Sequence, residues 1–432
     1  MEAGLSTKNA PSPSIVLPHY IFGAISFLIA TVLLLISSSG DFTHYMSPKL
    51  LSITHIMVLG WITMIIMGAL YQLVPVVMEV RLHSEKIALI TFIVFGLGVT
   101  FMSIAFWSFT FSRSILLEIG GVLVLIAMIL FAFNILKSAL KTQRKDIENT
   151  FVITSVFWLL ITVIAGIIIT FNFAFNFIHE SHIQLLKMHA HIGVVGWFLL
   201  LVIGVASKLM PMFLIVHKLP RTLLIYSFIF TNIGLIMLTT GYYYINHQWF
   251  LILSSGLIIL GIFFFLRFNL IAFRKRIRKN LDTGMKLSAA AFMMLGISVL
   301  FGLFSVITPD LFTDIQNRID ITYGFLILFG FLTSLVLGQT YKTLPFIIWL
   351  HRYKSLVGKF KVPLPVELYS DRMANIHYYT YLVGMLFMII GILSNNVLAL
   401  KAGASCLLIT AILYNYNVFK IIFHKTQNNE SK

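Results

Sequence analysis

Two histidines in long apolar stretches are the residues whose type and spacing most clearly predict chemistry. Gly60, Gly68 and Pro75 follow His55 by 5, 13 and 20 residues. The same three intervals recur at His191, Gly196, Gly204 and Pro211. Ionisable side chains inside a bilayer are costly and usually serve a function, and neutral imidazole is a ligand of metals and of haem iron. Two histidines at equivalent positions therefore favour a ligand over the alternative of a hydrogen-bonded helix contact.

A third copy of the pattern lacks its histidine. Gly330, Gly338 and Pro345 keep the spacing, but Phe325 stands where the histidine would be. Successive copies are offset by 136 and 134 residues. An internal parallel repeat with three units is therefore predicted, and its third unit has no ligand at this position.

A second histidine, His189, lies two residues before His191. Two residues turn a helix by about 200°, so the two rings point to nearly opposite sides. We expect His191 to pair with His55, because only these two are equivalent in the repeat. His189 remains an alternative partner or a ligand at a second site.

The composition predicts a membrane protein with twelve spans. The 432 residues have a mean hydropathy of +0.95, and 59% are hydrophobic while only 11% are charged. Apolar runs long enough to cross a hydrocarbon core of about 30 Å recur along the chain. The predicted spans cover residues 15–38, 50–78, 85–110, 114–138, 150–175, 183–213, 221–246, 248–272, 283–307, 320–349, 371–394 and 396–423.

The net charge of +16 predicts an orientation rather than a nucleic-acid partner. Basic residues gather at both termini and in alternate loops, as the positive-inside rule requires. Of the 31 lysines and arginines, the exceptions are Lys49, Arg113, Lys187, Arg318 and Lys401. We therefore expect a multi-pass protein of the plasma membrane with both termini in the cytoplasm and the lipid bilayer as its partner.

These spans predict an all-α fold with one integral membrane domain, residues 1–432. Its three four-helix repeats would cover residues 15–138, 150–272 and 283–423.

At 100° per residue, Gly60 and Gly68 would lie opposite His55 and would allow a neighbouring helix to approach closely. Lys208 and Lys342, equivalent in the repeat, are predicted to be interfacial anchors whose charges reach water.

Two further features bear on metals and redox chemistry. The single cysteine, Cys406, excludes a disulfide within one chain, and no C-x-x-C-H sequence exists for covalent haem attachment. His179 and His182 lie in a predicted outer loop on either side of Glu180, a spacing that is a weaker candidate for a metal site. Solvated loop residues are the favoured interpretation there.

The run Trp61…Gly68-Ala69-Leu70-Tyr71-Gln72-Leu73-Val74-Pro75, together with twelve spans and a histidine early in the second, resembles the haem-copper oxidase superfamily. The cbb3-type oxidase subunit I, nitric oxide reductase large subunit and NnrS-like branches are the most similar in pattern. The resemblance implies that His55 is an axial ligand of a non-covalent b-type haem. The repeat makes His191 the candidate second ligand, with His189 as the alternative.

The departures from that family restrict the function. Span 10 has Phe325 and no histidine, and span 7 has none either, so the usual binuclear centre is not apparent. The resemblance then implies a haem b protein, with copper open, in a nitric oxide or oxygen-related redox or stress response rather than a terminal oxidase. Oxidoreductase activity stays open, as do two alternatives: a transporter or channel on the same repeat, and a cofactor-depleted scaffold subunit.

Overall fold

The computed structural model describes residues 9–40, 44–108, 114–143, 146–245, 247–308 and 313–425. The chain divides into two compact units, which we describe separately. Unit 1 comprises Met1–Ala10, Tyr71–Asn280 and Leu295–Tyr323, and unit 2 comprises Pro11–Leu70, Leu281–Met294 and Gly324–Lys432. The predicted single domain, the repeat boundaries and the cytoplasmic termini stay predictions.

The prediction of an all-α protein with twelve spans is confirmed. Within the described residues, twelve helices are long and apolar enough to cross a membrane. Nine are continuous helices: α1 (Pro13–Ser37), α4 (Glu85–Ser108), α5 (Ile115–Ala139), α6 (Ile147–Phe175), α9 (Thr222–Thr240, extended by η4, Gly241–Ile245), α10 (Gln248–Arg274), α11 (Thr283–Ile307), α14 (Asp371–Ser394) and α15 (Val397–Ile422). The other three are the helices that carry the repeated pattern.

Each of these three helices is interrupted by a π-helical segment at the same place. The second span consists of α2 (Pro48–His55), η2 (Ile56–Thr63) and α3 (Met64–Val77). The sixth consists of α7 (His182–His191), η3 (Ile192–Leu199) and α8 (Leu200–Leu214). The tenth consists of α12 (Thr313–Phe325), η5 (Leu326–Leu332) and α13 (Thr333–Arg352). In every copy the wider turns begin directly after His55, His191 or Phe325, and π segments of this kind are frequent at functional sites.

The π segments overturn the predicted angle between histidine and first glycine. A π turn joins residues five apart by hydrogen bonds, so Gly60 lies roughly one turn along the axis from His55. It does not lie about 140° round the helix, because the value of 100° per residue holds only for an α-helix. The wider turns place the histidine and the first glycine on similar sides.

The second glycine of each copy makes the close helix contact that small residues allow. A Cβ atom on Gly68 would lie 2.7 Å from the Cβ of His19 in α1, and one on Gly204 would lie 3.0 Å from the carbonyl oxygen of Glu148 in α6. A Cβ on Gly338 would lie 2.5 Å from the carbonyl oxygen of Gly284 in α11. Each repeated helix thus packs tightly on the span before it.

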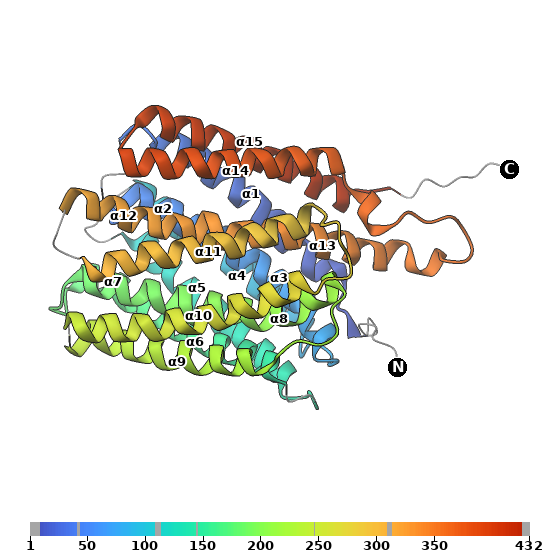
Figure 1. The fold of residues 1–432 in the computed structure, drawn as a ribbon, viewed down its shortest axis with the longest axis horizontal. Helices are drawn as coiled ribbons and strands as arrows, with labels where there is room; N and C mark the ends of the chain where they lie inside the picture. Colours follow the sequence, from blue (N-terminus) through green and yellow to red (C-terminus); the bar gives the residue numbers. More distant parts are fainter. Residues whose placement is uncertain are drawn as a thin grey trace. The chain divides into compact units, whose positions relative to one another are not determined.

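The spans that follow pack as hairpins within each unit. In unit 1, α4 packs along α5 and α9 along α10, and in unit 2 α14 packs along α15 (Figure 1). Short connections produce these pairs, since consecutive spans joined by a few residues lie antiparallel. Asn395 lies between α14 and α15 with a positive φ of 52°, which is a common helix-ending conformation for asparagine.

Candidate functional site

His55 and His191 have the same local geometry although they lie in different units. Nδ1 of His55 is 2.8 Å from the carbonyl oxygen of Leu51, and Nδ1 of His191 is 2.7 Å from that of Lys187. A carbonyl can only accept, so Nδ1 carries the proton and Nε2 carries the ring's lone pair. Both side chains are half-buried. Each helix therefore holds its imidazole in the tautomer that presents Nε2 as a ligand.

The bond from Nδ1 to the carbonyl one turn back also fixes the direction of the ring. Ligand histidines in metal sites usually donate their other N–H to a carbonyl or carboxylate, which sets the ring orientation and raises its basicity. His55 and His191 are the last residues of α2 and α7, directly before η2 and η3. The π segment begins at the residue after the histidine, so the change in backbone geometry occurs directly beside the candidate ligand.

His189 contacts the neighbouring helix instead of its own. Its Nδ1 lies 3.1 Å from the carbonyl oxygen of Thr162 in α6. A Cβ atom on Gly166, also in α6, would lie 2.9 Å from the His189 ring. The glycine makes room for this ring, which gives His189 a packing role between α7 and α6. Its predicted role as a ligand stays a prediction.

Two tyrosines that sequence reasoning missed flank His191 in unit 1. The ring centroid of Tyr242, in η4, is 5.6 Å from that of His191, and the ring of Tyr323, in α12, is stacked at 6.3 Å. Tyr323 lies two residues before Phe325, so the tenth span contributes a phenol beside His191. The run Gly241-Tyr242-Tyr243-Tyr244 at the end of span 7 was the available signal.

The third copy is apolar at the position that bears histidine in the other two. Phe325 is buried and stacks on Phe329, with ring centroids 4.7 Å apart. One π turn separates these two rings along η5. The side chain at the ligand position thus packs against its own helix.

His179 and His182, which we expected in an outer loop, have different surroundings. His182 stacks on Phe173 at 5.1 Å, and its Nδ1 is 3.5 Å from the side-chain amide of Asn172, while His179 is exposed. Among the described residues, no group of three or more His, Cys, Asp or Glu side chains is placed to hold a metal ion. His182 is thus the first residue of α7 and packs on Phe173, so it is not the solvated loop residue that we expected, and its weaker candidacy as a metal ligand stays a prediction.

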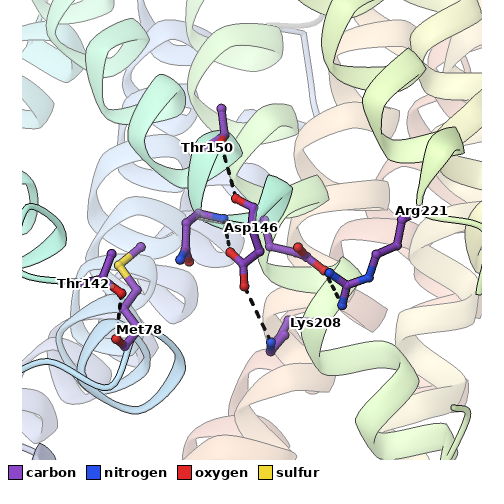
Figure 2. Close-up of polar contacts among 8 residues, drawn as sticks. Met78, Thr142, Asp146, Thr150, Lys208 and Arg221 are labelled. Atoms are coloured by element: carbon purple, nitrogen blue, oxygen red, sulfur yellow. Dashed lines mark hydrogen bonds and ion pairs between the residues drawn. The ribbon is translucent and has the colours of Figure 1, made fainter. Parts of the chain in front are cut away.

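The proline ends of the second and third copies carry ion pairs. Asp146 precedes α6 and accepts a hydrogen bond from the Asn149 amide at 3.1 Å, while its other oxygen is 3.9 Å from Nζ of Lys208 (Figure 2). Asp282 precedes α11, accepts from the Met285 amide at 3.1 Å and pairs with Lys342. The predicted interfacial anchors are thus paired with aspartates that cap the preceding span.

Unit 1 has a further pair beside the first one. Nη2 of Arg221 lies 3.4 Å from Oε1 of Glu148, in the first turn of α6 (Figure 2). Arg221 is 60% exposed and Glu148 only 3%. A carboxylate near a helix N-terminus is favoured by the helix dipole. The ion pair also joins the first turn of α6 to Arg221, which directly precedes α9.

The comparisons with known proteins identify the fold. No family model matches the chain. An uncharacterised protein of Aquifex aeolicus (strain VF5) is 23% identical over 297 residues, which cover 68% of this chain and 70% of that protein. A chain of a haem-copper terminal oxidase dimer, solved by cryo-electron microscopy, is similar with a TM-score of 0.69 at 10% identity, covering 96% of this chain and 84% of that chain.

The chain is therefore a multi-pass membrane protein with the fold of a haem-copper terminal oxidase. This similarity confirms, at the level of the fold, the resemblance seen in the sequence around Trp61 and Pro75. An identity of 10% shows the fold alone, and function has to be argued from the site.

Proposed function

We propose that this chain is a membrane protein that binds b-type haem non-covalently through His55 and His191. The observation that carries the proposal is the shared geometry of the two histidines, each with Nδ1 bonded to the carbonyl one turn back. Neutral imidazole with a lone pair on Nε2 is the form that binds haem iron. The donor set of the chain thus fits the cofactor that the fold suggests.

The two histidines lie in different units, and the proposal covers two ligand arrangements. If both bind one iron, the haem is six-coordinate and suited to electron transfer or sensing. If each binds its own iron, or only one binds, a position stays open for a diatomic gas such as nitric oxide or oxygen. A bound haem supplies one-electron chemistry, and the chain supplies the orientation of the two imidazoles.

The same proposal assigns a role other than terminal oxidation. Span 7 has no histidine, and span 10 has Phe325 stacked on Phe329 at the repeated position. The chain's own residues thus do not provide the usual ligand set for a binuclear centre. We propose a redox or stress-response role involving nitric oxide or oxygen, with copper content as a separate measurement.

The test is an absorption spectrum of the purified full-length protein, with a pyridine haemochrome assay and metal analysis. We expect a Soret band and a b-type haemochrome. If the histidines share one iron, His55→Ala and His191→Ala each remove most of the haem. If they bind separate irons, each variant removes about half. His217, which is exposed after α8, provides the control His217→Ala, which should retain the wild-type spectrum.

The proposal fails if the wild-type protein has no Soret band after expression with sufficient haem supply. It also fails if both histidine variants keep the wild-type spectrum and haem content. His189→Ala separates the remaining possibility, because haem loss in His55→Ala and His189→Ala but not in His191→Ala would make His189 the ligand in place of His191.

A further inference from the structure

His377 is a buried imidazole that the proposed haem site does not use. It lies in α14 of unit 2 and has no exposed surface. Among the described residues, neither of its ring nitrogens has a hydrogen-bond partner. His377 thus differs from His55 and His191, whose Nδ1 atoms bond to the carbonyl four residues back.

Two tyrosines from neighbouring helices pack against this ring. The ring centroid of Tyr341, in α13, is 5.7 Å from that of His377, and the ring of Tyr414, in α15, is at 6.1 Å. Both tyrosines are buried. His377 is thus held where α13, α14 and α15 meet.

The hydroxyl groups of these tyrosines keep unused hydrogen-bonding capacity. The Tyr341 hydroxyl accepts from Nδ2 of Asn417 at 3.3 Å, and within the described part of the chain its own hydrogen has no acceptor. The Tyr414 hydroxyl donates to Oγ1 of Thr340 at 3.1 Å, which leaves its lone pairs to accept. The two rings that pack against His377 thus carry one unused donor and one unused acceptor, beside an imidazole whose two nitrogens are unpaired.

Leaving these groups unpaired would be expensive. A buried polar group without a partner loses its hydration and gains no hydrogen bond in return. A buried water typically makes two to four hydrogen bonds to such groups. A metal ion is a poor alternative, because no group of three or more metal-binding side chains occurs among the described residues.

We propose that His377, Tyr341 and Tyr414 enclose a water-binding site inside unit 2. One or two water molecules bridge the imidazole to the tyrosine hydroxyls and so join α13, α14 and α15 through hydrogen bonds. The site is independent of haem, since none of its residues is a proposed ligand. Its ligand is water, and its effect is to make a buried histidine compatible with an apolar bundle.

The direct test is a cryo-electron microscopy map of the full-length protein at a resolution that shows ordered water. We expect density within hydrogen-bonding distance of a ring nitrogen of His377 and of the Tyr341 hydroxyl. Absence of such density in a map that shows water elsewhere in the bundle would overturn the proposal.

Thermal unfolding of variants in detergent gives a second test whose sign differs between a dry and a hydrated site. In a dry site, His377→Phe removes an unpaired polar group and the midpoint rises or is unchanged. In a hydrated site the same change removes bridging hydrogen bonds, so the midpoint falls. A midpoint at or above that of the wild type would contradict the proposal.

A double-variant cycle shows whether water couples the side chains. His377 and Tyr341 share no direct hydrogen bond, yet a bridging water makes the shifts from His377→Phe and Tyr341→Phe non-additive. Tyr353, whose hydroxyl bonds to Nδ1 of His424 at 2.7 Å, is the control, because Tyr353→Phe should add to His377→Phe. Additive shifts for both pairs would count against the water. If His377→Phe does not fold, the wild-type map decides.

Discussion

The second and third copies of the repeated helix share the features that pack the helix and differ in those that bear chemistry. Both have a π segment, a second glycine against the preceding span and an aspartate–lysine pair. At the first end, His191 lies between two tyrosines, whereas Phe325 stacks on its own helix. Packing at these positions therefore does not depend on a ligand-bearing side chain.

The same two copies also differ at the proline end. The helix α8 ends at Ile215, which has a positive φ of 55°, a strained conformation for a β-branched residue. The equivalent first-copy residue, Glu79, has a φ of 57°. In the third copy α13 continues to Arg352. The third copy thus lacks a histidine at one end and has a longer helix at the other.

The largest expected effect comes from filling the glycine contact that both copies share. A Cβ on Gly338 would lie 2.5 Å from a backbone oxygen, whereas on Gly204 the closest atom is the Phe151 Cβ at 2.7 Å. Overpacking of this kind costs about 1–3 kcal/mol. We expect Gly338→Ala to lower the thermal midpoint more than Gly204→Ala, because its Cβ would lie 2.5 Å from a backbone oxygen, whereas the backbone oxygen near Gly204 would be 3.0 Å away.

A glycine in open space provides the control for these variants. A Cβ on Gly256, in α10, would have no atom within 4 Å, so Gly256→Ala should melt at or slightly above the wild-type temperature. Equal midpoints for Gly338→Ala and the wild type would show that the close contact with α11 is not needed. The shared packing of the two copies would then need another explanation.

The sequence predicts the fold of this molecule more completely than it predicts the candidate site. Twelve spans follow from hydropathy alone, and the spacing from His55 to Pro75 led to the correct fold resemblance. The π segments did not follow, because apolar residues on all sides of these helices give no periodicity that separates a π turn from an α turn. Tyr242 and Tyr323 could not be assigned to His191, since only tertiary packing brings spans 6, 7 and 10 of unit 1 together there.

The ion-pair partners of Lys208 and Lys342 could not be predicted from the sequence either. Lys208 and Lys342 could be placed at helix ends, where snorkelling to water is the usual expectation. Their partners, Asp146 and Asp282, lie about 60 residues earlier in the chain. Sequence proximity cannot reveal such pairs. The signal was available in the repeat, because each aspartate begins the first span of a predicted unit.

The next prediction compares these two ion pairs. Lys342 is 11% exposed and in close contact with Asp282, whereas Lys208 is 27% exposed and 3.9 Å from Asp146. A partly exposed pair contributes less than a fully buried one, and exposed pairs contribute about 1 kcal/mol or less. We expect Lys342→Met to destabilise the protein by an intermediate amount and by more than Lys208→Met in thermal unfolding.

Removal of the aspartates distinguishes the ion pair from the helix cap. Asp282→Asn keeps an oxygen for the Met285 amide and should match Lys342→Met if the pair accounts for the loss. If Lys208→Met proves the more destabilising of the two lysine variants, exposure and distance are the wrong measures of these contacts. At the proline end, the ion pair of the second copy would then be the stronger of the two.

The smallest expected effect tests the extension that only the third copy has. At the end of α13, the guanidinium of Arg352 donates to the carbonyls of Ile422 and His424, and the Tyr353 hydroxyl meets the His424 ring. Burial, followed by the positive charges of Arg352 and Lys420, lowers the pKa of His424 below its ordinary value of 6.5. The folded state therefore favours neutral imidazole at this contact.

The sign of the pH dependence follows from this shift. Where the folded pKa is depressed, the unfolded or detached segment binds the proton more readily, so stability is lost as pH falls through about 6.5 and below. Hydrogen exchange of the amides near the end of α15 should accelerate in the wild type over that range. In His424→Gln this pH dependence should be smaller once the intrinsic exchange rate is corrected. An identical dependence in both proteins would show that His424 does not control this contact, and that Arg352 holds the end of α15 there without it.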